Sequence, residues 1–219
     1  MLTVFASVVC LMMMAGPAVA MPEGDPAPEG AASAATPELP RVRPYDARSA
    51  ALLLQGLERS DTIRALVDRL DGRDVIVYVE MNPSLVRRKL AGTLTWQAHG
   101  GLFRYVRISL NPELTTALLI ATIGHELQHA VEVAEAPDIT DPASLQAHYA
   151  RHGIATRGHQ NGWDTIAAQQ VGELVRRQLG NERTSRALET LEGFDPEEWH
   201  IVYRQARDRF AARRDRQFD

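Results

Sequence analysis

The chain is 219 residues long, 45% of its residues are hydrophobic, 24% are charged, and its formal net charge is −4. A chain of this length accommodates one principal domain with a hydrophobic core. The acidic balance argues against a nucleic-acid-binding protein, because such proteins usually carry a basic surface.

The first twenty residues have the features of an export signal. They contain no charged side chain and end in Ala-Val-Ala at residues 18–20, a small-x-small cleavage pattern. We therefore predict that residues 1–20 are a cleaved signal peptide, that the protein is periplasmic or secreted, and that no stable membrane span is left after cleavage. Cys10 is the only cysteine and would leave with the signal, so a metal site would have to be built from His, Asp and Glu.

Residues 21–44 hold six of the twelve prolines and almost no large apolar side chain. Such a segment buries too little surface to offset the entropy lost on ordering. The sequence predicts a disordered tether over residues 21–44 and a folded domain over residues 45–219.

The first part of this domain is predicted to contain helices followed by strands. Residues 47–72 read as one or two helices, with Ser60 as a cap between them. Residues 75–81 (VIVYVEM) form an apolar, β-branched run that predicts a central strand. Residues 92–110 predict a hairpin, in whose second run apolar and polar residues alternate, so one face of that run would be buried.

The second part is predicted to be helical. One helix starts with Asn111 as its cap and Pro112 in its first turn, and it runs to about Glu135. Further helices are predicted at residues 142–152, 162–179 and 195–215, the last within a C-terminal segment that extends to residue 219. These predicted helices and strands together indicate a single α+β domain.

That helix carries the sequence HELQH, residues 125–129. At 100° per residue, His125 and His129 lie about 40° apart on the helix and one turn from each other, so both imidazoles can reach one metal ion. Glu126 flanks them, and the opposite side of the helix is apolar. Two imidazoles can hold Zn²⁺ while leaving room for a third ligand and a water, from which Glu126 would accept a proton as the water attacks a carbonyl carbon.

The HELQH sequence and the order of elements before it resemble the zincin metallopeptidases. The resemblance implies a zincin-like α+β fold, in which a small antiparallel or mixed sheet packs against the helix that carries HELQH and further helices follow. It also implies Zn²⁺ bound by His125 and His129, Glu126 as general base, and a strand lying along the substrate, here residues 103–110. The metzincin branch adds a helix-breaking glycine and a further ligand, but Glu132 and Glu135 occupy those positions. Because nothing at Glu132 would break the helix, this branch is excluded.

The gluzincin branch takes its third ligand from a second, downstream helix, which implies Asp164. Within the helix predicted at 162–179, Asp164 lies on the same face as the apolar residues, which would be buried, whereas Glu173 points toward solvent. A carboxylate on a buried face needs a partner, which a metal would supply. The alternative is that Asp164 is a first-turn acid in a capping box with Asn161.

Other candidates for the third ligand stay open. Glu132 lies on the histidine face and is either a ligand, a hydrogen-bond partner of an imidazole, or a solvated acid. His148 and His152, four residues apart on the next helix, could complete a three-histidine site, stabilise an oxyanion, or be solvated. Tyr149 and His159 are further candidates for these roles.

The sequence therefore predicts an exported, zinc-dependent metallopeptidase that acts on a peptide or protein substrate through Glu126, with His125, His129 and Asp164 as metal ligands. Two alternatives are a noncatalytic zincin-like scaffold and a zinc hydrolase of a non-peptide substrate. Substrate specificity and oligomeric state do not follow from the sequence.

Overall fold

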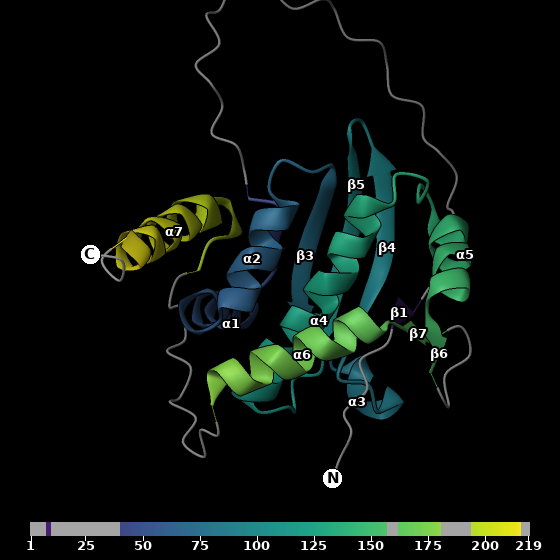
Figure 1. Cartoon of the computed structure of the whole chain (residues 1–219), viewed down its shortest axis with the longest axis horizontal. Coiled ribbons are helices and arrows are strands. Elements are labelled where there is room, and N and C mark those ends of the chain that lie inside the picture. Colours follow the sequence, from purple (N-terminus) through teal and green to yellow (C-terminus); the bar gives the residue numbers. More distant parts are fainter. Residues whose placement is uncertain (1–7, 10–39, 157–161, 181–193, 216–219) are drawn as a thin grey trace, which may run out of the picture.

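The computed structural model describes residues 8–9, 40–156, 162–180 and 194–215, with residues 8–9 and 210–215 described by their backbone alone (Figure 1). Most of the predicted signal peptide and tether lies outside the described residues, so export stays a prediction. The predicted end of the tether at residue 44 is wrong, because β2 (Val42–Pro44) pairs with the central sheet and Val42 is buried, so the folded domain begins before residue 45. None of the described helices is long and apolar enough to cross a membrane.

The described chain is a mixed α/β structure built around a four-stranded sheet (Figure 1). The strand order is β2 (Val42–Pro44), β3 (Val75–Met81), β5 (Phe103–Leu110) and β4 (Gly92–Gly100). Strands β2, β3 and β5 are parallel, whereas β4 is antiparallel to β5. The predicted central strand is confirmed, because β3 has a partner on each side and its three valines and Ile76 are buried.

The predicted hairpin is confirmed, with β4 and β5 joined through Gly101 at a φ of 58°. However, β5 lies between β3 and β4, so both of its edges are already hydrogen-bonded. The expectation that residues 103–110 lie along a substrate is therefore wrong. The hairpin pattern predicts two strands but not which of them pairs with β3, and the strand left at the edge of the sheet is β4.

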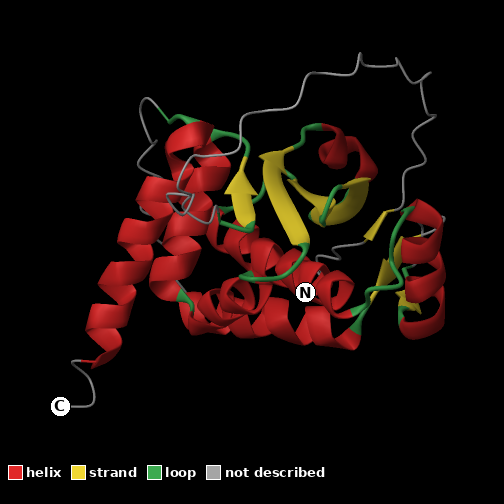
Figure 2. Cartoon of the chain, turned by 90° about the horizontal axis from the view of Figure 1, so that it is seen from above, coloured by secondary structure: helices red, strands yellow, loops and turns green. Residues whose placement is uncertain are grey.

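The central helix is α4 (Thr116–Glu135), which carries the HELQH motif. It packs on the sheet and contacts α1 (Ala47–Arg59), α2 (Asp61–Leu70) and α6 (Ile166–Leu179). Seen from above, most helices lie on one side of the sheet (Figure 2). Every residue from Leu119 to Val131 is buried, so the histidine side of the helix is covered as well as the apolar side.

The start of α4 differs from the prediction. Thr115 is its N-cap and accepts from the N–H of Leu118, whereas Asn111 accepts from the N–H of Glu113 in a turn. The N–H of Asn111 still pairs with the carbonyl of Ala91, which continues the sheet. The chain therefore needs a few residues to leave the sheet before the helix begins. The predicted end at Glu135 is confirmed.

Asp164 does not lie on a helix. It ends β7 (Gly162–Asp164), which pairs with β6 (Ile154–Ala155) and with β1 (Val8–Val9) in a second, small sheet. Helix α6 begins at Ile166, after the N-cap Thr165. The capping-box alternative for Asp164 is therefore wrong, and Asn161 lies outside the described residues.

The remaining helices follow the sequence pattern. Ser60 accepts from the N–H of Ile63 and separates α1 from α2, as predicted. Helix α5 follows Asp141 and ends before Gly153. The C-terminal helical region begins with a short 3₁₀ turn and continues in α7, at the opposite end of the structure from α5 (Figures 1 and 2). Helix α3 spans Ser84–Arg88, α5 spans Pro142–His152, the 3₁₀ turn spans Pro196–Glu198 and α7 spans Trp199–Asp215.

Two glycines allow α4 and α6 to approach closely. A Cβ atom on Gly124 of α4 would lie 2.7 Å from a methyl carbon of Val175. On α6, a Cβ atom on Gly172 would lie 3.3 Å from the Cβ of His125. The absence of side chains at these positions brings the helix that follows Asp164 against the helix that carries the histidines.

Candidate metal centre

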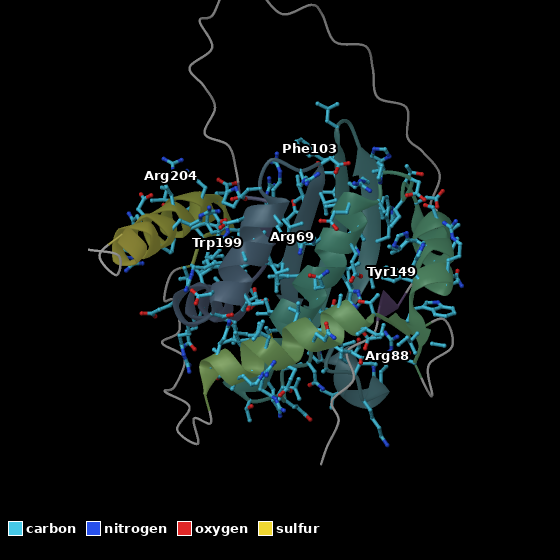
Figure 3. The ribbon with its side chains drawn as sticks, viewed as in Figure 1. Arg69, Arg88, Phe103, Tyr149, Trp199 and Arg204 are labelled. Atoms are coloured by element: carbon cyan, nitrogen blue, oxygen red, sulfur yellow. The ribbon has the colours of Figure 1, made fainter. Side chains whose placement is uncertain are left out.

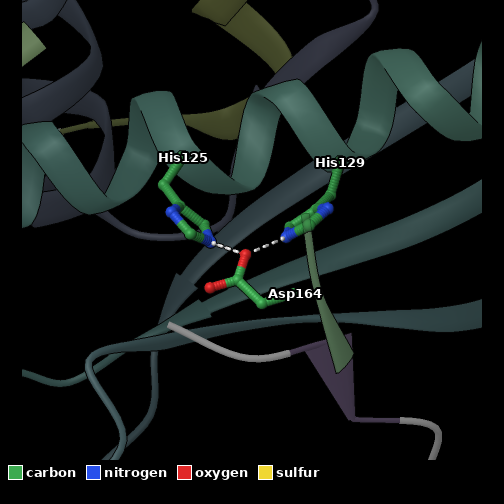
Figure 4. Close-up of side chains that lie close together, drawn as sticks. All are labelled: His125, His129 and Asp164. Atoms are coloured by element: carbon green, nitrogen blue, oxygen red, sulfur yellow. Dashed lines mark ion pairs between the residues drawn. The ribbon is translucent and has the colours of Figure 1, made fainter. Parts of the chain in front are cut away.

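Three side chains that the sequence predicts as metal ligands lie together (Figure 4). Oδ1 of Asp164 is 3.2 Å from Nε2 of His125 and 3.5 Å from Nε2 of His129. The two imidazole rings meet edge to face, with their centroids 5.0 Å apart. The ligand atoms of His125, His129 and Asp164 lie within 4.8 Å of one another, and all three residues are buried.

The spacing of these atoms fits a tetrahedral ion. Ligand atoms about 2.0–2.2 Å from a tetrahedral zinc lie roughly 3.3–3.6 Å apart, close to the two nitrogen–oxygen distances found here. Both Nε2 atoms are buried without a hydrogen-bond partner among the described residues, although an oxygen is near each. Such an arrangement of orphaned donor atoms is what a metal ion would satisfy.

The position of Asp164 before α6 orients its carboxylate. Oδ1 accepts from the N–H of Thr165 at 2.7 Å, and Oδ2 accepts from Nε2 of Gln169 at 3.0 Å. The end of a strand brings the backbone near the histidines, so a short aspartate arm reaches them. Sequence reasoning missed Thr165 and Gln169, although a Thr followed by a helical pattern is a typical N-cap signal.

Glu132 contacts the far side of His129. Its Oε2 lies 2.9 Å from Nδ1 of His129 and also accepts from the Tyr149 hydroxyl at 3.1 Å. Its Oε1 accepts from the Thr165 hydroxyl at 2.8 Å. Of the three roles left open by the sequence, the geometry matches a hydrogen-bond partner of an imidazole rather than a ligand or a solvated acid.

Glu126 is fully buried, and neither of its carboxylate oxygens has a hydrogen-bond partner in the described part of the chain. Its side chain packs against the first residue of β4, where a Cβ atom on Gly92 would lie 3.1 Å from Oε1. A buried carboxylate without a partner costs free energy and marks a place where a water or ligand would bind. The sequence contains no pattern from which the contact with Gly92 could be predicted.

Three buried or partly buried carboxylates, those of Glu126, Glu132 and Asp164, surround the two histidines, so the centre favours additional positive charge. Burial, together with the nearby carboxylates of Asp164 and Glu132, raises the pKa of Glu126 to about 8. Burial lowers the pKa of His129, but the nearby carboxylates of Asp164 and Glu132 outweigh this effect and raise the pKa to about 9. Both shifts favour added positive charge at the centre, which a divalent cation would also supply.

The other candidates lie elsewhere. Glu135 pairs with Arg69 at the exposed end of α4. His148 and His152 contact each other on α5 and do not join the group formed with Asp164. Tyr149 is buried and projects from α5 toward α4, where its hydroxyl donates to Glu132 (Figure 3). His159 lies outside the described residues.

No family model, curated protein or solved structure matches the chain. The resemblance to zincins therefore rests on the HELQH motif and on the order of the predicted elements.

Proposed function

We propose that the protein is a zinc-dependent metallopeptidase in which His125, His129 and Asp164 hold the metal and Glu126 is the general base. The observation that carries the proposal is the Glu126 carboxylate, which is buried without a partner beside a group of three converging donor atoms. A site that only stabilised the fold would not require this costly carboxylate.

The side chains have distinct roles in such a reaction. Zinc, when bound, lowers the pKa of a coordinated water toward neutrality. Glu126 accepts the proton of that water and can pass it to the leaving amine. Asp164 is held ionised by its contacts with the histidines, which keep its pKa below its usual range despite burial.

The edge of the central sheet supports a peptide as the substrate class. Within the described residues, β4 pairs on one side only, and its first residue, Gly92, touches Glu126. An extended peptide that added to this edge would pass the general base, and its backbone would be held by main-chain hydrogen bonds. The zincin resemblance favours the same class.

One observation favours a second candidate, a noncatalytic scaffold. His125 is 7% exposed, Asp164 is 1% exposed, and His129 and Glu126 are fully buried. A substrate could reach these groups only if a covering segment moved. A metal at this position would then stabilise the fold without hydrolysing anything.

Replacement of the general base distinguishes the two candidates. The full chain is purified without chelators, its zinc content is determined, and hydrolysis of a mixture of unstructured peptides is followed by mass spectrometry. We expect about one zinc per chain, and a loss of at least about 100-fold in hydrolysis for Glu126→Gln with zinc binding retained.

The matched control is Glu135→Gln, which changes an exposed glutamate of the same helix and should leave hydrolysis unchanged. Zinc without hydrolysis in the unaltered protein would support the scaffold. A folded protein without zinc would refute the peptidase and would leave only a scaffold that holds no metal.

A further inference from the structure

Glu132 joins three elements around the candidate metal centre. It lies on α4, one turn beyond His129, and its carboxylate accepts hydrogen bonds from α5 through Tyr149 and from the start of α6 through Thr165. The Tyr149 hydroxyl also lies 3.2 Å from the carbonyl of His129. The side chain of Glu132 therefore links its own helix, α4, to α5 and to the start of α6.

The contact with His129 determines which ring nitrogen carries the proton and which carries the lone pair for a metal ion. Nδ1 faces an acceptor that has no proton to donate while ionised, so the proton of the neutral imidazole lies on Nδ1. The lone pair of the ring is then on Nε2, which is the atom directed at Asp164. A carboxylate at this position also increases the basicity of the imidazole as a ligand.

The contact with Thr165 reaches the other ligand-bearing element. The hydroxyl of Thr165 donates to Glu132 and accepts from the N–H of Ala168, so it caps α6 at the same time. The N–H of Thr165 donates to Oδ1 of Asp164. Glu132 is thus two hydrogen bonds away from the aspartate and one away from the histidine.

We propose that Glu132 is a positioning residue that fixes His129 and Asp164 relative to each other, so that both present their donor atoms to one metal ion. This inference rests on the proposed function, because it assigns Glu132 a role in metal binding. In this role both carboxylate oxygens of Glu132 act as acceptors, one from the Tyr149 hydroxyl and the other from the Thr165 hydroxyl. A residue that merely filled space between α4, α5 and α6 would not need to accept these hydrogen bonds.

The test measures zinc affinity by competition with a chelator and the absorption spectrum of the Co²⁺-substituted protein, both at a temperature where every variant is folded. Glu132→Gln keeps the size of the side chain but removes its charge, and we expect zinc affinity to fall about 10- to 100-fold with an altered Co²⁺ spectrum. Glu135→Gln is the matched control and should leave affinity and spectrum unchanged.

Two variants keep the test decisive if Glu132→Gln does not fold. Thr165→Val removes the donor from α6 and should weaken zinc binding, whereas Thr165→Ser keeps the hydroxyl and should restore it. Thermal unfolding of the metal-free variants provides the readout for a purely structural role, which would lower the unfolding temperature without changing the affinity of the folded protein.

The outcomes separate this inference from the proposed function. If the unaltered protein binds zinc and Glu132→Gln binds it as tightly as Glu135→Gln, the positioning role is refuted while the proposed function stands. If the unaltered protein binds no zinc, the proposed function fails and the positioning role fails with it.

Discussion

Arg104 anchors the end of the helix that carries the candidate metal ligands, and its removal should destabilise the protein strongly. This β5 side chain is 2% exposed and forms two 2.7 Å hydrogen bonds to the carboxylate of Asp74. Its Nη1 also donates to the carbonyls of Val133, Ala136 and Ile139 at 2.9, 2.7 and 3.1 Å. A positive charge at this C-terminal end also complements the helix dipole.

The size of the effect follows from what Arg104→Met leaves behind. Breaking a buried ion pair costs about 3–5 kcal/mol when the remaining charge is buried. The side chain of Asp74 is 44% exposed and can be rehydrated, so we expect the lower end, about 3 kcal/mol. For a domain of this size, that corresponds to a fall of roughly 6–12 °C in the unfolding temperature.

The measurement is thermal and urea unfolding of Arg104→Met beside Arg69→Met. Arg69 pairs with Glu135 near the same end of α4, but both side chains are about half exposed, so its loss should cost no more than about 1 kcal/mol. If the two variants were equally stable, the buried network of Arg104 would not hold the end of α4 and the reasoning would be refuted.

Three further predictions concern the third metal ligand, the pH dependence of stability, and the contact between α4 and α6. Asp164→Ala should weaken zinc binding roughly 10²–10³-fold, about one ligand's share of a typical structural zinc affinity, whereas Glu173→Ala should not; chelator competition checks both. The hydrogen bonds from Arg104 lower the pKa of Asp74. Its contribution to stability is therefore fully present above the unfolded-state pKa near 4 and is lost as the pH falls below it. Acid unfolding between about pH 4 and 2 should depend less on pH in Asp74→Asn than in the unaltered protein. Gly124→Ala should destabilise the protein by about 1–3 kcal/mol in urea unfolding, because its new methyl group overlaps α6; an unchanged midpoint would mean that the helices can separate at no cost.

Local sequence patterns predicted most elements correctly. The β-branched run at 75–81, the Ser60 cap and the Asp141 start each depend on residues close together in the chain. The predictions failed where a distant partner decides the structure. Asn111 has a good capping side chain, but its backbone is still paired with Ala91, so α4 begins later.

The same division holds at the candidate site. The spacing of His125 and His129 on one helix follows from 3.6 residues per turn and needs no tertiary information. That Asp164 joins them was expected from the resemblance, but its place on β7 rather than on a helix was not. Strand pairing between β7 and β6 outweighs the helical pattern of the residues that follow.

The sequence by itself determined the HELQH helix, the apolar strands and the choice of donor residues, because helical spacing and hydrophobic periodicity are properties of neighbouring residues. Only the tertiary structure decided that β4 is the edge strand, that Glu126 lies buried against Gly92, and that Glu132 connects His129 to Thr165. These contacts join residues far apart in the chain. They depend on how closely the helices and the sheet pack, and no local pattern encodes that distance.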